Sequence, residues 1–268
     1  MNIHDEHLTP LLRDCSDADL MPVRDTILRT FTNCLDVDEA YLRAPDQPSS
    51  YVDELIAELR RFGGNTLANI ARNDGVPYAR IARAAAEKAG ARCAGDASVE
   101  EVEWALIAHA LDGAVAKLGA DSRAALEAEF ERAGFDGVAL EGHEPLSAQL
   151  ARVGIRAGSF GAYRAVVMVA GAFARDRLGE DADVPAHAAL ARAMSVIAAP
   201  VGAVASPLYA LIHLGGPAYR VTIPAVAQIG FLRLQQQHAM ELVTPQAVAM
   251  PQPRVSWSGH DAVSGADW

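Results

Sequence analysis

Helix-start and helix-stop signals recur along this chain, and stretches that alternate between apolar and polar residues are few. Ser16 precedes an amphipathic pattern, and Ser98-x-x-Glu101 has the capping-box spacing, in which both side chains bond free backbone N–H groups. The same Ser-x-x-acid spacing predicts a helix that begins at Ser50 and ends after Phe62. The pattern therefore predicts an all-α fold, a multi-helix array with a Gly/Ala-rich apolar C-terminal helical bundle or hairpin.

Further helices are expected from glycine and proline punctuation. Pro77 suits a first helical turn and Gly90 a left-handed C-cap, so a helix is predicted between them. The helix after Ser98 is expected to run to Gly119, and Asp121 to cap the next one. A long helical pattern, interrupted by glycines, covers residues 145–177.

Charge divides the chain into unequal parts. Net charge is −11, and residues 1–150 carry 27 acidic and 14 basic side chains whereas residues 151–268 carry 7 and 9. We therefore expect three regions, an acidic helical region at 1–143, an apolar Gly/Ala-rich helical region at 144–242 and a flexible tail at 243–268. An acidic chain lacks the phosphate-neutralising charge of a generic nucleic-acid binder, so no nucleic-acid partner is expected.

Residues 193–219 carry no formal charge, which is the sharpest local feature. As a helix this run would be longer than the ~30 Å hydrocarbon core of a bilayer is thick. Its apolar side chains favour insertion into the bilayer, but Pro200 and Pro207 oppose it, so the free energy of insertion is near zero. A buried hairpin in a helical bundle and a conditional membrane contact both fit. The candidate interface or membrane residues are Val204, Leu208, Leu211, Tyr219 and Arg220.

Arg220 stands between two apolar runs, and burying an arginine alone is costly. We expect it to pin its helix to the acidic front half, with a ligand or lipid-headgroup contact as the alternative.

The end of the helix at Phe62 offers a candidate anion or ligand site. Backbone N–H groups at a helix start can bind an anion, and two arginines lie close in sequence. The residues of this candidate site are Arg60, Arg61, Gly63, Gly64, Asn65, Asn69 and Tyr78. A simple helix stop followed by an Asn or Thr cap explains the same residues.

Other reactive side chains are scattered. His4-Asp5-Glu6-His7 could in principle hold a metal, but no partner follows at a standard spacing, so no metal site and no cofactor are expected. Cys15, Cys34 and Cys93 are interpreted as small buried hydrophobes. None of the common nucleophile, phosphate-loop or dinucleotide motifs occurs, and no catalytic residue is assigned.

Residues 58–69 (ELRRFGGNTLAN) and 218–226 (AYRVTIPAV) resemble the YaaW-like bacterial family, which is sometimes labelled ubiquinol–cytochrome c chaperone-like. The opening 11–16 (LLRDCS) is also similar, so the resemblance spans most of residues 11–235. It implies a mostly helical protein, adds no catalytic residues, and carries no established activity.

These observations favour a non-enzymatic interaction or chaperone-like accessory protein with a protein partner. The start of the chain lacks a secretory pattern, so we expect a cytoplasmic location, with peripheral inner-membrane contact as a variant. The alternative is a conditionally membrane-inserting stress or defence effector that uses residues 193–232. A hydrolase or transferase with a site between Gly63 and Tyr78 is the third class.

Overall fold

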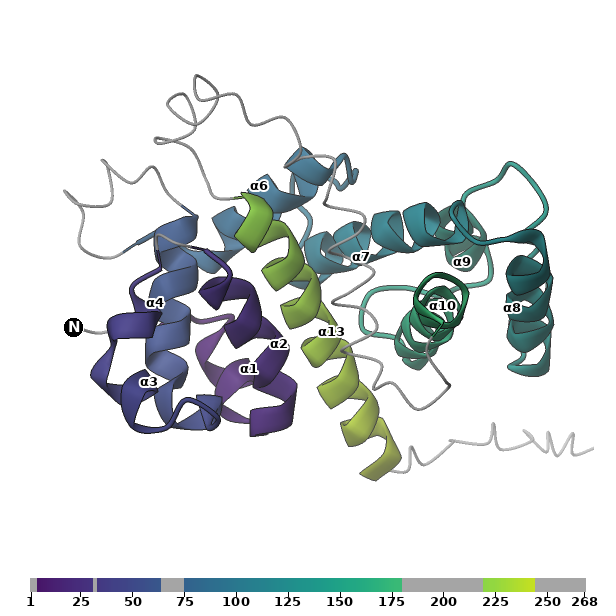
Figure 1. Ribbon diagram of the computed structural model, residues 1–268. Helices are drawn as coiled ribbons and strands as arrows, with labels where there is room; N and C mark the ends of the chain where they lie inside the picture. Colours follow the sequence, from purple (N-terminus) through teal and green to yellow (C-terminus); the bar gives the residue numbers. More distant parts are fainter. Residues whose placement is uncertain (1–3, 31–32, 64–74, 180–218, 244–268) are drawn as a thin grey trace, which may run out of the picture.

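The computed structural model describes residues 4–30, 33–63, 75–179 and 219–243, and all regular structure within these ranges is helical (Figure 1). The all-α prediction is thus confirmed for the part of the chain described. In order the helices are α1 (Thr9–Arg13), α2 (Asp17–Leu28), α3 (Glu39–Arg43), α4 (Val52–Phe62), α6 (Tyr78–Ala89), α7 (Val99–Val115), α8 (Ala120–Arg132), α9 (Leu146–Arg152), α10 (Phe160–Leu178) and α13 (Tyr219–Val243). Two short 3-10 turns, η1 (Leu35–Val37) and η2 (Pro48–Tyr51), flank α3.

Several helix ends follow directly from local sequence. Ser16 and Ser98 are N-caps, and each forms a reciprocal capping box with the acid three residues later, Asp19 and Glu101. Gly90 ends α6 in the left-handed conformation with φ of 89°. These predictions are confirmed, because a cap depends on a few neighbouring residues.

The predicted capping box at Ser50 is wrong. Pro48–Tyr51 is a 3-10 turn in which the Ser50 hydroxyl donates to the Gln47 carbonyl at 2.7 Å, and α4 begins at Val52. The Asp53 carboxylate instead accepts from Arg13 of the preceding α1 at 3.0 Å. The acid expected to cap α4 therefore joins α4 to α1.

The helices around Gly119 also differ from expectation. α7 ends at Val115 rather than at Gly119, and α8 begins at Ala120 with Gly119, not Asp121, as its N-cap. Asp176 of α10 supplies the missing capping carboxylate, because it accepts from the Gly119 N–H at 3.2 Å. A tertiary contact thus starts α8.

The pattern at 145–177 is two helices rather than one. Gly154 and Gly158 have φ of 85° and 75°, which breaks the chain between α9 and α10. Gly161 and Gly171 lie within α10. A positive φ is cheap only for glycine, so these two positions decide the break.

Helix α13 lies at the centre of the molecule, between the N-terminal helices α1–α4 and the group α7–α10 (Figure 1). It packs against α2, α4, α6, α7 and α10, and residues 221–232 along its middle are all buried, which is typical of a helix enclosed by protein. Buried side chains along it are Val221, Ile223, Ala225, Val226, Ala227, Ile229, Phe231, Leu232 and Leu234. Buried residues of both charge regions of the chain therefore share one hydrophobic core.

Glutamines of α13 bond the N-terminal helices. Gln228 donates to the Thr26 hydroxyl at 3.1 Å, Gln235 to the Asp19 carboxylate at 3.0 Å, and Gln236 to the Leu11 carbonyl at 3.0 Å. Because these amides have fixed partners, they set the position of α13 along α1 and α2 as well as stabilising the contact.

Within the described ranges no helix contains a stretch that is both long and apolar enough to cross a bilayer. Residues 221–232 of the candidate membrane segment lie in α13 inside the protein core, whereas Tyr219 is half-buried and Arg220 is exposed. Residues 193–218, including Val204, Leu208 and Leu211, lie outside the described residues, as does the predicted tail from residue 244.

Phe62, the last residue of α4, is 7% exposed and belongs to the core, in agreement with the predicted register of that helix. We expect Phe62→Ala to lower the free energy of unfolding by about 3–5 kcal/mol, because the truncated ring leaves a cavity. Chemical denaturation followed by circular dichroism measures this difference. Leu42→Ala on α3, where the side chain is 63% exposed, is the matched control and should change stability by less than about 0.5 kcal/mol. Equal effects of the two substitutions would show that the Phe62 ring does not pack in the core.

Candidate functional site

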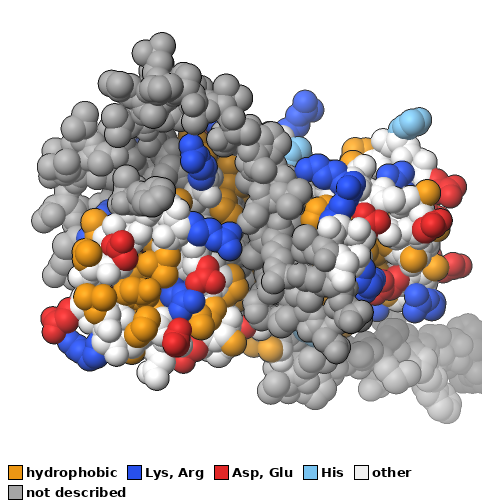
Figure 2. All heavy atoms as spheres, in the orientation of Figure 1, with side chains coloured by type: hydrophobic (Ala, Val, Ile, Leu, Met, Phe, Trp, Pro, Cys, Tyr) orange, Lys and Arg blue, Asp and Glu red, His pale blue; other side chains and the backbone are white. Residues whose placement is uncertain are grey.

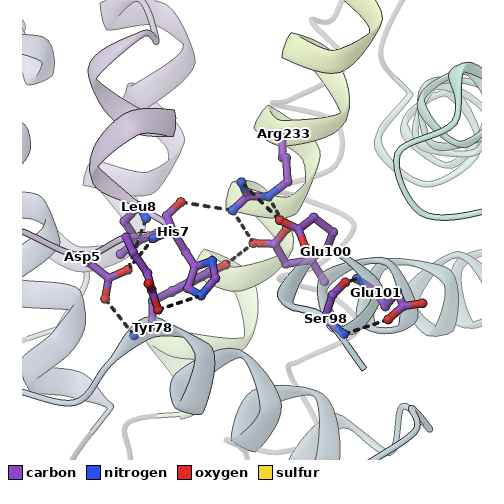
Figure 3. Close-up of polar contacts among 10 residues, drawn as sticks. Asp5, His7, Leu8, Tyr78, Ser98, Glu100, Glu101 and Arg233 are labelled. Carbon is purple, nitrogen blue, oxygen red and sulfur yellow. Dashed lines mark hydrogen bonds and ion pairs between the residues drawn. The ribbon is translucent and has the colours of Figure 1, made fainter. Parts of the chain in front are cut away.

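Three polar side chains from distant parts of the chain meet in the core, where α6, α7 and α13 converge (Figure 3). The Tyr78 hydroxyl donates to Glu103 Oε1 at 2.8 Å, and Arg233 Nε donates to Glu103 Oε2 at 2.8 Å. Tyr78 is fully buried and Glu103 is 2% exposed. We call Tyr78, Glu103 and Arg233 the buried cluster.

The N-terminal segment covers one side of the buried cluster (Figure 3). Asp5 Oδ2 accepts from the Tyr78 backbone N–H at 3.0 Å, and Asp5 Oδ1 accepts from the N–H groups of His7 and Leu8. Arg233 Nη2 also donates to the His7 carbonyl at 3.2 Å. The Asp5 carboxylate and the His7 carbonyl thus hold the segment in place, and no group of three potential metal ligands occurs among the described residues.

Burial dominates the electrostatics of the buried cluster. It raises the pKa of Tyr78 well above the usual value, and the neighbouring Glu103 charge raises it further. Burial also raises the pKa of Glu103, although the Arg233 hydrogen bond and charge oppose the rise. For Arg233 burial acts to lower the pKa, but the hydrogen bond to Glu103 and the charges of Glu103, Tyr78 and Glu100 together outweigh it, so the net shift is upward. The cluster therefore holds a neutral phenol and a carboxylate–guanidinium pair whose charges satisfy each other, which suits it to joining helices.

The residues of the predicted anion site are only partly brought together. Gly63 is the C-cap of α4 with φ of −70°, and Arg61 donates to Glu58 Oε2 at 2.6 Å. Arg60 donates to the Val76 carbonyl at 3.4 Å, while the hydroxyl of Tyr78 bonds Glu103 in the core. Gly64, Asn65 and Asn69 lie outside the described residues, so the anion site stays a prediction.

Among the described residues Arg220 has no carboxylate partner, in contrast to the ion pair expected of it. It is exposed near the start of α13, and the pair with the acidic front half is made by Arg233, thirteen residues further along the same helix. Tyr219 is half-buried beneath the Lys88 ammonium, which lies 5.6 Å from the ring centroid.

A groove between α8 and α10 is lined entirely by described residues. Its volume is about 300 Å³, and Ala133, Tyr163, Val167 and Met168 supply its apolar surface. Arg132, Arg164 and Glu129 supply its polar groups. We call these residues the α8–α10 groove.

Exposed apolar side chains also occur elsewhere on the surface. Figure 2 shows hydrophobic side chains, interspersed with charged ones, over the N-terminal helices. The most exposed large hydrophobic residues there are Val37, 73% exposed, and Leu42, 63% exposed, from η1 and α3. Phe160, next to the α8–α10 groove, is 40% exposed and lies against the Arg164 guanidinium.

The three cysteines differ in environment. Cys15 is buried as expected, but Cys34 is exposed and Cys93 is half-buried, so the common interpretation of all three as buried hydrophobes is wrong. Burial raises the pKa of the Cys15 thiol to about 11, and the nearby Asp19 charge adds to the rise. The folded state thus retains the Cys15 proton more strongly than the unfolded chain, and its stability falls as the pH rises from 9 toward 11.

We expect the thiols to react with iodoacetamide at very different rates at pH 8. Cys34 should react like an exposed peptide thiol. Cys15 should react at least about a hundredfold more slowly, because little thiolate forms and the sulfur is covered. Mass spectrometry of two variants that each retain one cysteine measures both rates. Comparable rates in the native state would contradict the burial of Cys15, and equal rates in denaturant are the control.

Neither Glu103 nor Arg233 is among the site residues that the sequence predicts. A signal for Glu103 exists, because Val99, Leu106 and Ile107 lie three or four positions away and share its helical face. A carboxylate on such an apolar face requires a buried partner. Its partner Arg233 lies 130 positions away, and no local pattern connects the two.

Comparison with known proteins places the chain among bacterial relatives. No family model and no solved structure matches it. A UPF0174 protein of Helicobacter pylori strain 26695 is 31% identical over 196 residues, which cover 73% of this chain and 93% of the relative. Two UPF0174 proteins of Helicobacter pylori strain J99 are 27% and 29% identical, over 75% and 72% of this chain and 78% and 92% of the relatives. These names carry neither the YaaW-like label nor the chaperone name, and the chain belongs to the UPF0174 family.

Proposed function

We propose that this protein acts by binding another protein, as an interaction or chaperone-like accessory protein, and that the α8–α10 groove is the binding surface. The observation that carries the proposal is the groove itself, an open concave surface with a largely apolar lining next to the half-exposed Phe160 ring. Concave apolar surfaces with a few placed polar groups are the usual form of binding sites.

The chemistry of the buried cluster supports the same proposal. The carboxylate, guanidinium and phenol that would attract attention as reactive groups bond one another inside the core. Their geometry joins α6, α7 and α13, so the cluster stabilises the body that carries the groove.

The size of the groove indicates a modest affinity. Two apolar side chains of a partner, buried in the groove, contribute about 3–6 kcal/mol. Association loses translational and rotational freedom of comparable magnitude. We therefore expect a transient complex that requires covalent capture in the cell.

The membrane-inserting alternative receives no support from the described residues. In the described part of its proposed segment, residues 221–232 are buried in α13, which packs against five other helices. The proposal does not depend on residues 193–218.

A site-specific photo-crosslink tests the proposal in the native host. A benzophenone amino acid replaces Arg132, which is exposed and lines the α8–α10 groove, and in a control strain it replaces Arg92, which is exposed in the loop after α6. We expect a discrete protein adduct from position 132 that is absent from position 92 and is lost when Val167→Glu is added. No adduct at position 132, or the same adducts at both positions, would overturn the proposed function. Unchanged circular dichroism and melting temperature of each variant establish that the fold is retained.

A further inference from the structure

We propose that the α8–α10 groove takes an acidic amphipathic helix, which contacts the apolar lining with one face and the two arginines with flanking carboxylates. This inference rests on the proposed function and specifies the chemistry of the partner.

The charge of the groove favours an acidic partner. Arg132 is exposed, and no carboxylate pairs with it among the described residues. Arg164 Nη1 donates to the backbone carbonyl of Ala133 at 3.0 Å, and within the same part of the chain it too has no carboxylate partner. Glu129 lies 3.4 Å from Arg175, which already offsets its charge. The groove of a protein with net charge −11 therefore presents two guanidinium groups whose charges the described carboxylates do not offset.

The fixed position of Arg164 favours the binding of a partner carboxylate. Its guanidinium lies 5.4 Å from the ring centroid of Phe135 and 5.5 Å from that of Phe160. A guanidinium held between two rings and a carbonyl keeps its planar fork in place, so a partner carboxylate loses less freedom on binding to it. Charge-assisted bonds of this kind add orientation to an apolar contact.

The shape of the groove favours a helical partner. Its lining comes from the last turn of α8, which supplies Glu129 and Arg132, from Ala133 directly after it, and from residues 163–168 in the first half of α10. A helix that lies in a groove between two helices presents apolar side chains at intervals of three and four residues. Met168 and Val167 supply the apolar contact, and a methionine adapts to partners of different shape. The neighbouring positions of such a partner, at the edges of the groove, meet Arg132 and Arg164.

Three peptides with the same apolar face test this inference on the full-length protein. Their flanking residues are glutamate, glutamine or lysine, and fluorescence anisotropy measures each dissociation constant at low and high salt. We expect the glutamate peptide to bind about tenfold more tightly than the lysine peptide at low salt, with the difference shrinking at high salt as the charges are screened. Arg132→Glu should abolish this preference, Arg132→Lys should retain most of it, and the control Arg92→Glu should leave it unchanged.

The outcomes separate this inference from the proposed function. Equal binding of the three peptides, or no binding of any, overturns the acidic-helix inference while a position-specific crosslink in the host still supports protein binding. Vesicles of phosphatidylcholine and phosphatidylglycerol are the second probe. If they bind and displace the glutamate peptide in an Arg132-dependent manner, a lipid headgroup is the ligand and the inference is overturned. A failed crosslink with a bound acidic peptide overturns the proposed function alone.

Discussion

Replacing Glu103 with alanine is expected to lower the free energy of unfolding by about 3–5 kcal/mol, the usual cost of removing one partner from a buried ion pair. The substitution leaves Arg233, whose side chain is 15% exposed, without the carboxylate that accepts at 2.8 Å. It also removes the acceptor of the fully buried Tyr78 hydroxyl. Urea denaturation followed by circular dichroism at neutral pH measures the change.

Two control variants test whether the loss of stability comes from the broken ion pair. Glu101→Ala removes a carboxylate two residues away that caps α7, and should cost only about 1 kcal/mol. The double variant Glu103→Leu/Arg233→Met removes both charges, and should be less destabilised than Glu103→Ala, because apolar replacement of a buried pair is often neutral. A double variant at least as unstable as Glu103→Ala would indicate that the Glu103–Arg233 pair stabilises the fold more than apolar side chains in its place.

Replacing Gly230 with alanine is expected to lower the free energy of unfolding by about 2–3 kcal/mol, although alanine is the better helix former. An added Cβ would lie 2.9 Å from the Cβ of Glu103 and 3.0 Å from the Cδ1 of Ile107, so α13 and α7 would have to separate. The same displacement would disturb the bonds that Arg233 makes to Glu103.

Gly171 offers the matched comparison. It lies inside α10, where, among the described residues, an added Cβ would meet only the Arg175 guanidinium, at 3.6 Å. Gly171→Ala should therefore raise the free energy of unfolding by about 0.5–1 kcal/mol through helix propensity alone. Thermal or chemical denaturation of both variants tests the opposite signs. A stabilising Gly230→Ala would contradict the close contact between α7 and α13.

The helical nature of this protein could be predicted where a few adjacent residues decide the conformation. The N-cap at Ser16, the capping box at Ser98 and the left-handed Gly90 are local features, and the sequence identifies them correctly. The predicted box at Ser50 failed because Ser50 lies in a 3-10 turn, where its hydroxyl bonds the Gln47 carbonyl, while Asp53 pairs with Arg13. Gly119 could not be recognised as an N-cap, because the carboxylate that bonds it belongs to Asp176 of α10.

The candidate site shows the same division more sharply. Periodicity places Glu103 on an apolar helical face, so the sequence by itself determines that this carboxylate needs a buried partner. The sequence cannot determine which basic side chain pairs with Glu103, because Arg220 and Arg233 both lie in apolar surroundings. Only the packing of α13 between α2, α6, α7 and α10 decides that Arg233 reaches Glu103, and that α8 and α10 leave a groove between them. Helix formation and capping depend on backbone bonds within one or two turns, whereas the choice of partner depends on which distant surfaces exclude water together.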